Sequence, residues 1–561
     1  MCLTGGVHPI QIHKNIKVIK LSNIENTANK YIFKFIIPLF ILLSIIYLIS
    51  KNIFTVLTFN SIFIISVILI ILLSNISIFS FENSLLILLF LTCVINSLPV
   101  IILNIEIFYP IILFAFLGFV IGSRFKTSEI EIGSFYKDIE FKILSIFIIL
   151  FTITITISVL FTILNNFNLF HFKNLEMQIY NIDVMGANSI DALLFSVEMY
   201  LNYIITFILF FLLIKRLKIT RRFLIKLFYT LFSANIIVFL VSLYQIFINQ
   251  GFGIQPHWIV LGRINSTMIN PNSFGFFLIL NIGIFTAYLF YLNKKHKVLC
   301  LLMLLILPLQ LLYSGSRTGL LGLAIFALLI IFYFSISILV NLIRNRRKNK
   351  NDILILVATL LLLVIIPISF SAFLIKTDIL ENKPILKPIL LERIENNIEQ
   401  TQEENSLTRI SSGRNIIWPQ AINMIKDYPL VGVGIGTFPL ELSNYFKLSN
   451  IDLRIVDYAL NTYLQILAEN GIFSFVFFIG FYIILFTIIF NNLKKIHQIR
   501  NRGFLIIIIF IIFTCLLMFN FVSGTNYFEG QILYSFLLIL LLLLSYNLKN
   551  NETYEKLKNK L

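Results

Sequence analysis

The sequence predicts an all-α, polytopic membrane protein with about fourteen membrane-spanning helices and one large polar loop. Of the 561 residues, 58% are hydrophobic and 13% are charged, and the mean hydropathy is +0.93. A soluble chain of this length needs more charge to cover its surface. Blocks without a charged residue, such as 353–375 and 504–522, have the ~20 residues that a helix needs to cross a bilayer. They lack the alternation of barrel strands, so helices are expected.

The expected spans follow from the positions of these apolar blocks. In order they are 35–50, 53–73, 84–103, 105–122, 143–164, 192–214, 223–248, 273–292, 298–313, 319–342, 353–375, 459–490, 504–522 and 529–547. Pro99 and the short link 104–106 leave a broken helix pair or a re-entrant hairpin as alternatives for the third and fourth. The four cysteines are scattered, which argues against a disulfide framework or a metal cluster; they are Cys2, Cys93, Cys300 and Cys515.

The distribution of basic residues predicts the orientation of the chain. With these spans, the Lys- and Arg-rich segments all fall on the side of the N-terminus: 124–142, 215–222, 294–297, 344–350, 494–502 and 549–560. Positively charged short loops are typically cytoplasmic, so both termini are expected in the cytoplasm. The net charge of +17 then indicates orientation and attraction to anionic lipids, and nucleic acid binding is the weaker interpretation. The chain divides into a cytoplasmic N-terminus (1–34), eleven spans (35–375), a large outer loop (376–460), three spans (461–547) and a cytoplasmic tail (548–561).

Polar residues persist at four places on the expected outer side, and the first is the segment before span 273–292. Arg263 is a permanently charged planar donor that suits phosphate or carboxylate. Asn270 and Asn272 can cap the next helix, whose free amides attract an anion. His257 lies just before this segment, next to Trp258. The alternative is an ordinary interfacial loop with a snorkelling Arg and a Trp anchor.

The second place is the turn 314–319, with the sequence Ser-Gly-Ser-Arg-Thr-Gly between two apolar spans. So short a turn holds Arg317 near the bilayer surface or inside a cavity. Ser316 and the two glycines leave backbone amides accessible, so an anion-binding nest is one interpretation. An Arg at the membrane edge that contacts lipid phosphate is the other.

The third place is the large outer loop. Arg414 precedes a segment in which Ile417, Trp418, Ala421, Met424 and Ile425 recur at helical spacing, which predicts an amphipathic helix over the membrane face with Pro419 in its first turn. Three glycines alternate in 432–436. No strand precedes them, so a nucleotide-binding loop is rejected. Tight turns or backbone contact with a sugar remain.

The fourth place is the start of span 459–490. Asn461, Gln465 and Glu469 follow each other at i, i+4 and i+8, which puts them on one helix face, with Glu469 about 12 Å beyond Asn461. A carboxylate there is expected to face a polar cavity, because lipid exposure costs several kcal/mol. An ion pair with a neighbouring Arg is the structural alternative. Glu198 in span 192–214 invites the same argument.

Together these segments resemble the O-antigen ligase and Wzy-type polymerase superfamily of bacterial envelope glycan assembly. The resemblance covers roughly residues 220 to 490 and rests on the order of the motifs, their common outer side and the single large late loop. The motifs are Arg263 with Asn270-Pro271-Asn272, the turn 314–319, Arg414 and Trp418 with 429–434, and 461–465 with 469–472.

The resemblance implies a GT-C-like, metal-independent, inverting glycosyltransferase without a cofactor, in the bacterial inner membrane. Its donor would be a polyprenyl-diphosphate-linked glycan, its acceptor a second glycan, and a chain-length regulator is a further expected partner besides the membrane lipids. Fixed cations stabilise a departing diphosphate, so the resemblance gives this role to three arginines, and Glu469 is one candidate for the base. The catalytic set is Arg263, Arg317, Arg414 and Glu469, and the substrate-binding set is His257, Asn272, Ser316, Trp418, Asn461 and Gln465.

One departure from the ligase pattern shifts the expected function. Ligases of this superfamily carry a His directly before the Asn-x-Tyr-Leu pattern, and this chain has Leu460 there. No His occurs between His296 and His497, so a repeat-unit polymerase is favoured, with transfer of a glycan to lipid A-core or protein as the alternative. Glu469, His257 or Asp457 are candidates for the missing base. A flippase or other transporter is a third hypothesis, although transporters tend to show repeated halves with polar sites at the midplane.

Overall fold

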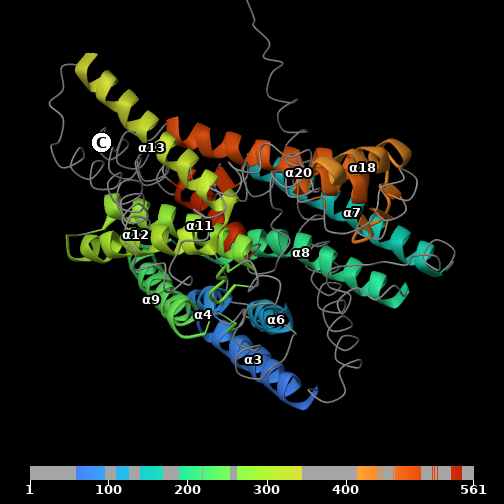
Figure 1. Cartoon of the computed structure of the whole chain (residues 1–561), viewed down its shortest axis with the longest axis horizontal. Coiled ribbons are helices and arrows are strands. Elements are labelled where there is room, and N and C mark those ends of the chain that lie inside the picture. Colours follow the sequence, from blue (N-terminus) through green and yellow to red (C-terminus); the bar gives the residue numbers. More distant parts are fainter. Residues whose placement is uncertain are drawn as a thin grey trace, which may run out of the picture.

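The structure is a computed structural model, and residues in eighteen segments of it are described. These are 59–94, 109–125, 139–167, 189–217, 219–249, 251–252, 262–268, 270–292, 294–343, 414–438, 441–442, 445–446, 459, 461–494, 508–509, 511, 514–515 and 532–545. The expected spans 35–50 and 353–375 and both chain termini lie outside them. Throughout the described segments the regular structure is helical, and no strand occurs there (Figure 1).

The longer helices fall where most of the apolar blocks predict them. Their bounds are α3 Phe59–Phe79, α4 Phe81–Val94, α6 Tyr109–Phe125, α7 Ile139–Phe167, α8 Ser189–Arg216, α9 Arg221–Phe247, α11 Pro271–Tyr291, α12 Lys294–Ser314, α13 Arg317–Ile343, α18 Arg414–Asp427 and α20 Thr462–Lys494. A further helix occupies 532–545. The chain is therefore an all-helical polytopic membrane protein, as the sequence predicts.

Several helices present an apolar surface outward, which a membrane protein needs. Within the described part of the chain, five helices are long and apolar enough to cross a membrane: 141–164, 221–247, 271–289, 295–314 and 462–492. Leu160 on α7, Leu240 on α9 and Phe473 on α20 are exposed. Large exposed apolar faces of this kind are expected where helices meet lipid rather than water. By contrast, 89% of the apolar stretch of α11 is buried inside the protein.

The N-terminal described helices differ from the prediction at the boundary between them. The sequence predicts a linker at 74–83, but α3 continues to Phe79 and only Ser80 separates it from α4. Two serines in this stretch join α3 to α6, because Ser74 Oγ donates to Gly118 O (3.1 Å) and Ser77 Oγ donates to Phe119 O (3.3 Å). Small polar residues are common at such membrane helix contacts, where they let two backbones approach.

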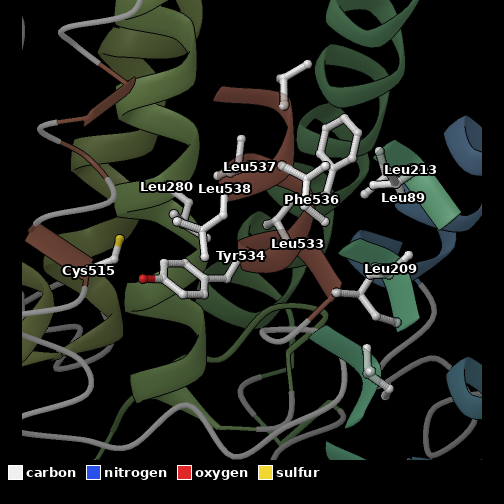
Figure 2. Packing of buried hydrophobic residues seen from close by; sticks show 14 of the residues in the cluster. Leu89, Leu209, Leu213, Leu280, Cys515, Leu533, Tyr534, Phe536, Leu537 and Leu538 are labelled. Carbon is white, nitrogen blue, oxygen red and sulfur yellow. The ribbon is translucent and has the colours of Figure 1, made fainter. Parts of the chain in front are cut away.

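The helix 532–545 lies in the centre of the hydrophobic core, and all of its residues are buried. Figure 2 shows it packed among α4, α8 and α11 through the labelled residues Leu89, Leu209, Leu213, Leu280, Leu533, Tyr534, Phe536, Leu537 and Leu538. Polar contacts add to this packing, since Ser535 Oγ donates to Thr206 Oγ1 of α8 (2.8 Å). A side-chain hydrogen bond fixes the register of such a helix where apolar packing alone is permissive.

A second, smaller hydrophobic cluster forms where the outer loop meets α20. Helix α18 packs on α20, and its buried residues Ile417, Ala421 and Met424 contact Phe438 and Ala468 within this cluster. The other side of α20 packs along α7, where the rings of Phe147 and Phe477 are 6.1 Å apart. The outer loop is thus anchored to the helix that carries Glu469.

Candidate functional site

Arg263 lies in the connection between α9 and α11, and its guanidinium reaches the end of α12. The side chain is only 4% exposed. Nε donates to Ser314 O (2.9 Å), and one terminal nitrogen donates to Asn272 Oδ1 (2.8 Å). Both acceptors are neutral, so neither compensates the charge. The structure therefore brings Arg263, Asn272 and the turn 314–319 together, as the prediction of a common site requires.

The start of α11 confirms one half of the capping prediction and corrects the other. Asn270 is the N-cap, and its Oδ1 accepts from the amides of Asn272 (2.9 Å) and Ser273 (2.8 Å). These amides are consequently not free for an anion, contrary to the expectation. Asn272 does not cap the helix, because its side chain accepts from Arg263 instead. Its role is to orient the guanidinium.

The turn between α12 and α13 also uses amides that were expected to be open. Ser316 N donates to Ser314 Oγ (3.2 Å), and Gly319 N donates to Ser316 Oγ (3.1 Å), so Ser316 caps α13 in the usual manner of a helix-starting serine. The expectation of a nest with all amides accessible is therefore wrong for these two. Arg317 begins α13 and is exposed at the same turn.

Two glycines allow this turn to sit against α11. A Cβ on Gly275 would lie 2.6 Å from Ser316 Oγ, and a Cβ on Gly319 would lie 3.3 Å from Gly275 Cα. The helices α11 and α13 therefore approach closely at these two glycines, with the small Ser316 side chain against Gly275, as small residues permit in membranes. This contact fixes the distance between the Arg263 connection and the first turn of α13.

The predicted amphipathic helix in the outer loop is confirmed as α18. Arg414 is its first residue, and Trp418 Nε1 donates to Ala459 O (2.9 Å). Ile417, Ala421 and Met424 face the interior. Pro419 does not lie in the first turn as expected, because the helix already begins at Arg414. It lies in the second turn, where a proline removes one helical hydrogen bond.

The glycine-rich segment 429–436 wraps around a break in α20. Gly471 has a φ of 74° and interrupts the helix, and the broken end is filled by the segment: Ile472 N donates to Pro429 O (2.9 Å) and Val433 N donates to Ala468 O (2.8 Å). Gly432 has a φ of 76°, a value that only glycine adopts without strain. The tight-turn interpretation is confirmed, and contact with a sugar stays a prediction.

Asn461, Gln465 and Glu469 lie on one face of α20, as their spacing predicts. Asn461 caps the helix by accepting from Tyr463 N (3.0 Å) and Leu464 N (3.1 Å). Gln465 Nε2 donates to Glu469 Oε1 (3.4 Å). All three side chains are buried, so the face lies under the outer loop.

The carboxyl of Glu469 accepts a backbone hydrogen bond from a residue that follows the glycine-rich segment. Its Oε1 accepts from Phe438 N (3.2 Å), whereas its Oε2 has no hydrogen-bond partner among the described residues. Its main-chain oxygen accepts from Gly434 N (3.0 Å) and from Ser158 Oγ of α7 (2.9 Å). The alternative of an ion pair with Arg finds no support in this part of the chain, where the partners of Glu469 are neutral.

The predicted residues therefore form two groups, one around Arg263 and Arg317 and one around Glu469. Within the described segments, the first group lies in the connection that contains Arg263 and at the ends of α11, α12 and α13, and the second lies on α18 and α20. His257 and Asp457 lie outside these segments, and Glu198 lies on α8 but its side chain is not among those described.

Residues 300–479 match the family model described as O-antigen ligase. This segment is therefore similar to O-antigen ligases. The match supports the resemblance and covers three of its four motifs, those in 314–319, 414–434 and 461–472, and no curated protein matches the chain. The O-antigen ligase segment contains Arg317, Arg414 and Glu469, while Arg263 precedes it in sequence and reaches it through the bond to Ser314.

Two polar residues of α8 and α9, which precede residues 300–479, also belong to the site although their sequence positions did not predict it. Gln245 of α9 makes hydrogen bonds to the Arg263 connection. Tyr203 of α8 is buried within electrostatic reach of Glu469, and its hydroxyl has no hydrogen-bond partner among the described residues. The available signal was a polar residue inside an apolar span, which is expensive to bury and so marks a specific contact.

Proposed function

We propose that the protein is a glycosyltransferase that joins polyprenyl-diphosphate-linked oligosaccharide repeat units on the outer side of the bacterial inner membrane, as a Wzy-type polymerase. In the proposed reaction an acceptor hydroxyl oxygen attacks the anomeric carbon of the donor. The bond from that carbon to the diphosphate oxygen breaks, the electron pair leaves with the polyprenyl diphosphate, and the hydroxyl proton passes to a base. Attack from the far side inverts the anomeric carbon. The family of residues 300–479 supports this class of chemistry.

The observation that carries the proposal is the meeting of Arg263 with the turn that starts α13. Arg263 is oriented by two neutral acceptors, and Arg317 stands exposed at the same turn. A departing diphosphate gains negative charge, and cations that are already fixed in place stabilise it without reorganisation. Arg414 at the start of α18 is proposed as a third cation, supplied by the outer loop.

Glu469 is the proposed base for the acceptor hydroxyl. Its Oε1 is occupied by Phe438 N, and its Oε2 has no hydrogen-bond partner among the described residues, so Oε2 is the atom that would take the proton. The carboxyl is fully buried under the segment around Phe438. An acceptor therefore reaches it only when this part of the outer loop moves.

The experiment for the clamp compares arginines at the site with an arginine away from it. Arg263→Ala and Arg317→Ala are expected to abolish chain growth while the proteins still insert into the membrane. Arg222→Ala is the matched control, because Arg222 is exposed at the start of α9. Normal glycan ladders in cells that carry either site variant refute the role of these arginines.

A second experiment separates the base from a structural partner. Glu469→Gln keeps an oxygen that can accept from Phe438 N but cannot take a proton. We expect a folded protein with little or no chain growth. Full activity of this variant reduces Glu469 to an anchor for the outer loop.

The family description keeps an O-antigen ligase-type transferase as the second candidate. The absence of a His anywhere in 300–479 favours the polymerase, because the ligase pattern uses one there. Incubation of the purified protein with lipid-linked repeat units distinguishes them: a growing ladder without a separate acceptor supports the polymerase. Product that forms only with added lipid A-core or protein acceptor supports the transferase.

A further inference from the structure

We propose that Gln245 is a positioning residue for the diphosphate clamp, through which α9 holds the connection 262–268 in the conformation that directs Arg263 to Ser314. The proposal rests on the proposed function of Arg263. Gln245 lies in α9, before the family segment, and is fully buried. Its amide faces the connection and not a neighbouring transmembrane helix.

The amide of Gln245 pairs with one residue of the connection in both directions. Its Oε1 accepts from Ser266 N (2.8 Å), and its Nε2 donates to Ser266 O (3.2 Å). The same Nε2 donates to Asn265 Oδ1 (3.0 Å) and to Phe252 O (2.8 Å). One side chain therefore satisfies both the N–H and the C=O of Ser266. Water is excluded there, so an unpaired backbone group would be costly.

Ser266 needs such support because of its backbone. Its φ is 51°, and it is the only non-glycine residue in the described segments with a positive φ. A residue with a Cβ avoids this left-handed region. Ser266 Oγ also donates to Val238 O (2.6 Å), and Val238 lies on α9 about two turns before Gln245. The helix α9 thus holds three polar atoms of Ser266.

The strained residue controls where Arg263 enters the site. Two residues lie between Arg263 and Ser266 along the chain, and the direction of the chain between them is set by the reversal at Ser266. The residues on either side of Ser266 are also fixed. Asn265 Nδ2 donates to Met268 O (2.6 Å), and Thr267 Oγ1 donates to Cys93 O of α4 (2.7 Å). Catalytic groups act from a narrow range of positions, and a displacement of about 1 Å can cost about a hundredfold in rate.

The chain offers a matched control in Gln310. It is buried in α12, and its Nε2 donates to Ser242 Oγ of the same helix α9 (2.8 Å). Its replacement by Leu removes a buried amide contact to α9 without touching the connection. A purely structural role of Gln245 predicts equal effects of the two substitutions.

The experiment measures kcat/KM for the lipid-linked donor with purified full-length Gln245→Leu, Gln310→Leu, Ser266→Gly and the double variant Gln245→Leu/Ser266→Gly. Gln245→Leu is expected to lower kcat/KM by about tenfold or more relative to Gln310→Leu. Glycine adopts the left-handed region freely. The double variant is therefore expected to have a kcat/KM about threefold higher than that of Gln245→Leu alone.

Two outcomes overturn the proposal. One is a kcat/KM of Gln245→Leu within about twofold of that of Gln310→Leu, and the other is no rise in kcat/KM when Ser266→Gly is added to Gln245→Leu. Arg263→Ala in the same set of variants distinguishes failure of the positioning role of Gln245 from failure of the clamp role of Arg263. If Arg263→Ala is inactive while Gln245→Leu is normal, the positioning role fails and the clamp stands. If Arg263→Ala is active, the clamp itself fails.

Discussion

Substitution of Gly432 by Ala tests the packing of the outer loop against the break in α20. The added Cβ would lie 2.3 Å from Glu469 C and 2.6 Å from Ala468 O, and these are backbone atoms that cannot rotate away. At a φ of 76°, a Cβ itself costs about 1–2 kcal/mol. Overpacking adds about 1–3 kcal/mol. The expected loss in the free energy of unfolding is therefore about 2–5 kcal/mol.

Gly315→Ala is the matched control for this substitution. Gly315 has a similar φ of 60°, but its Cβ would only approach the side chain of Arg263, at 3.3 Å, so the cost is mainly the ~1–2 kcal/mol of the backbone. The assay is thermal unfolding of both proteins in the same detergent. The apparent Tm of Gly432→Ala is expected to fall further than that of Gly315→Ala. An equal or smaller fall for Gly432→Ala refutes the described contact between the glycine-rich segment and α20.

Three further predictions follow from other contacts. Gly122→Ala is expected to lower thermal stability by about 1–3 kcal/mol, because its Cβ would lie 2.2 Å from Ser74 O between α3 and α6; unchanged unfolding contradicts that contact. Burial, together with the hydroxyl's bond to Asp427 Oδ2 (2.6 Å), raises the pKa of Tyr445. This stabilisation is complete below about pH 10 and is lost as the pH rises through the raised pKa, so limited proteolysis should show an alkaline weakening of the outer loop that Tyr445→Phe lacks. Trp418→Phe removes the bond to Ala459 O and should cost about 1 kcal/mol, visible as faster proteolysis of the loop; an unchanged rate assigns Trp418 no structural role.

The features that could be predicted from sequence depend on local patterns. The buried face of α18 follows from residues at helical spacing, and the cap at Asn270 follows from an Asn-Pro pair before an apolar block. The shared face of Gln465 and Glu469 follows from helical geometry. Each of these patterns fixes a contact within a few residues, so no knowledge of the tertiary packing is required.

The features that could not be predicted depend on partners far away in sequence. The glycines of 432–436 suggested turns. The structure shows a further requirement at Gly434, because Thr162 Oγ1 on α7 would lie 2.5 Å from a Cβ at this position and leaves no room for a side chain. The amides expected to be free at Ser316 and Asn272 are taken by neighbouring side chains. Gln245 carried only the signal of a buried amide, and its partner at Ser266 is fixed by the packing of α9 against the connection.

The enclosed helix 532–545 has a consequence for the order of assembly in the cell. Ribosomes complete this segment after α4, α8 and α11, yet it occupies the space between those three (Figure 2). Membrane insertion of the earlier helices therefore precedes their final packing, which waits for a late segment to enter from the bilayer. A nascent chain halted before residue 532 holds an unfilled interior, and close-packed interiors do not tolerate a gap of that size. Quality-control proteases that recognise loosely packed membrane helices are thus expected to remove such truncated chains.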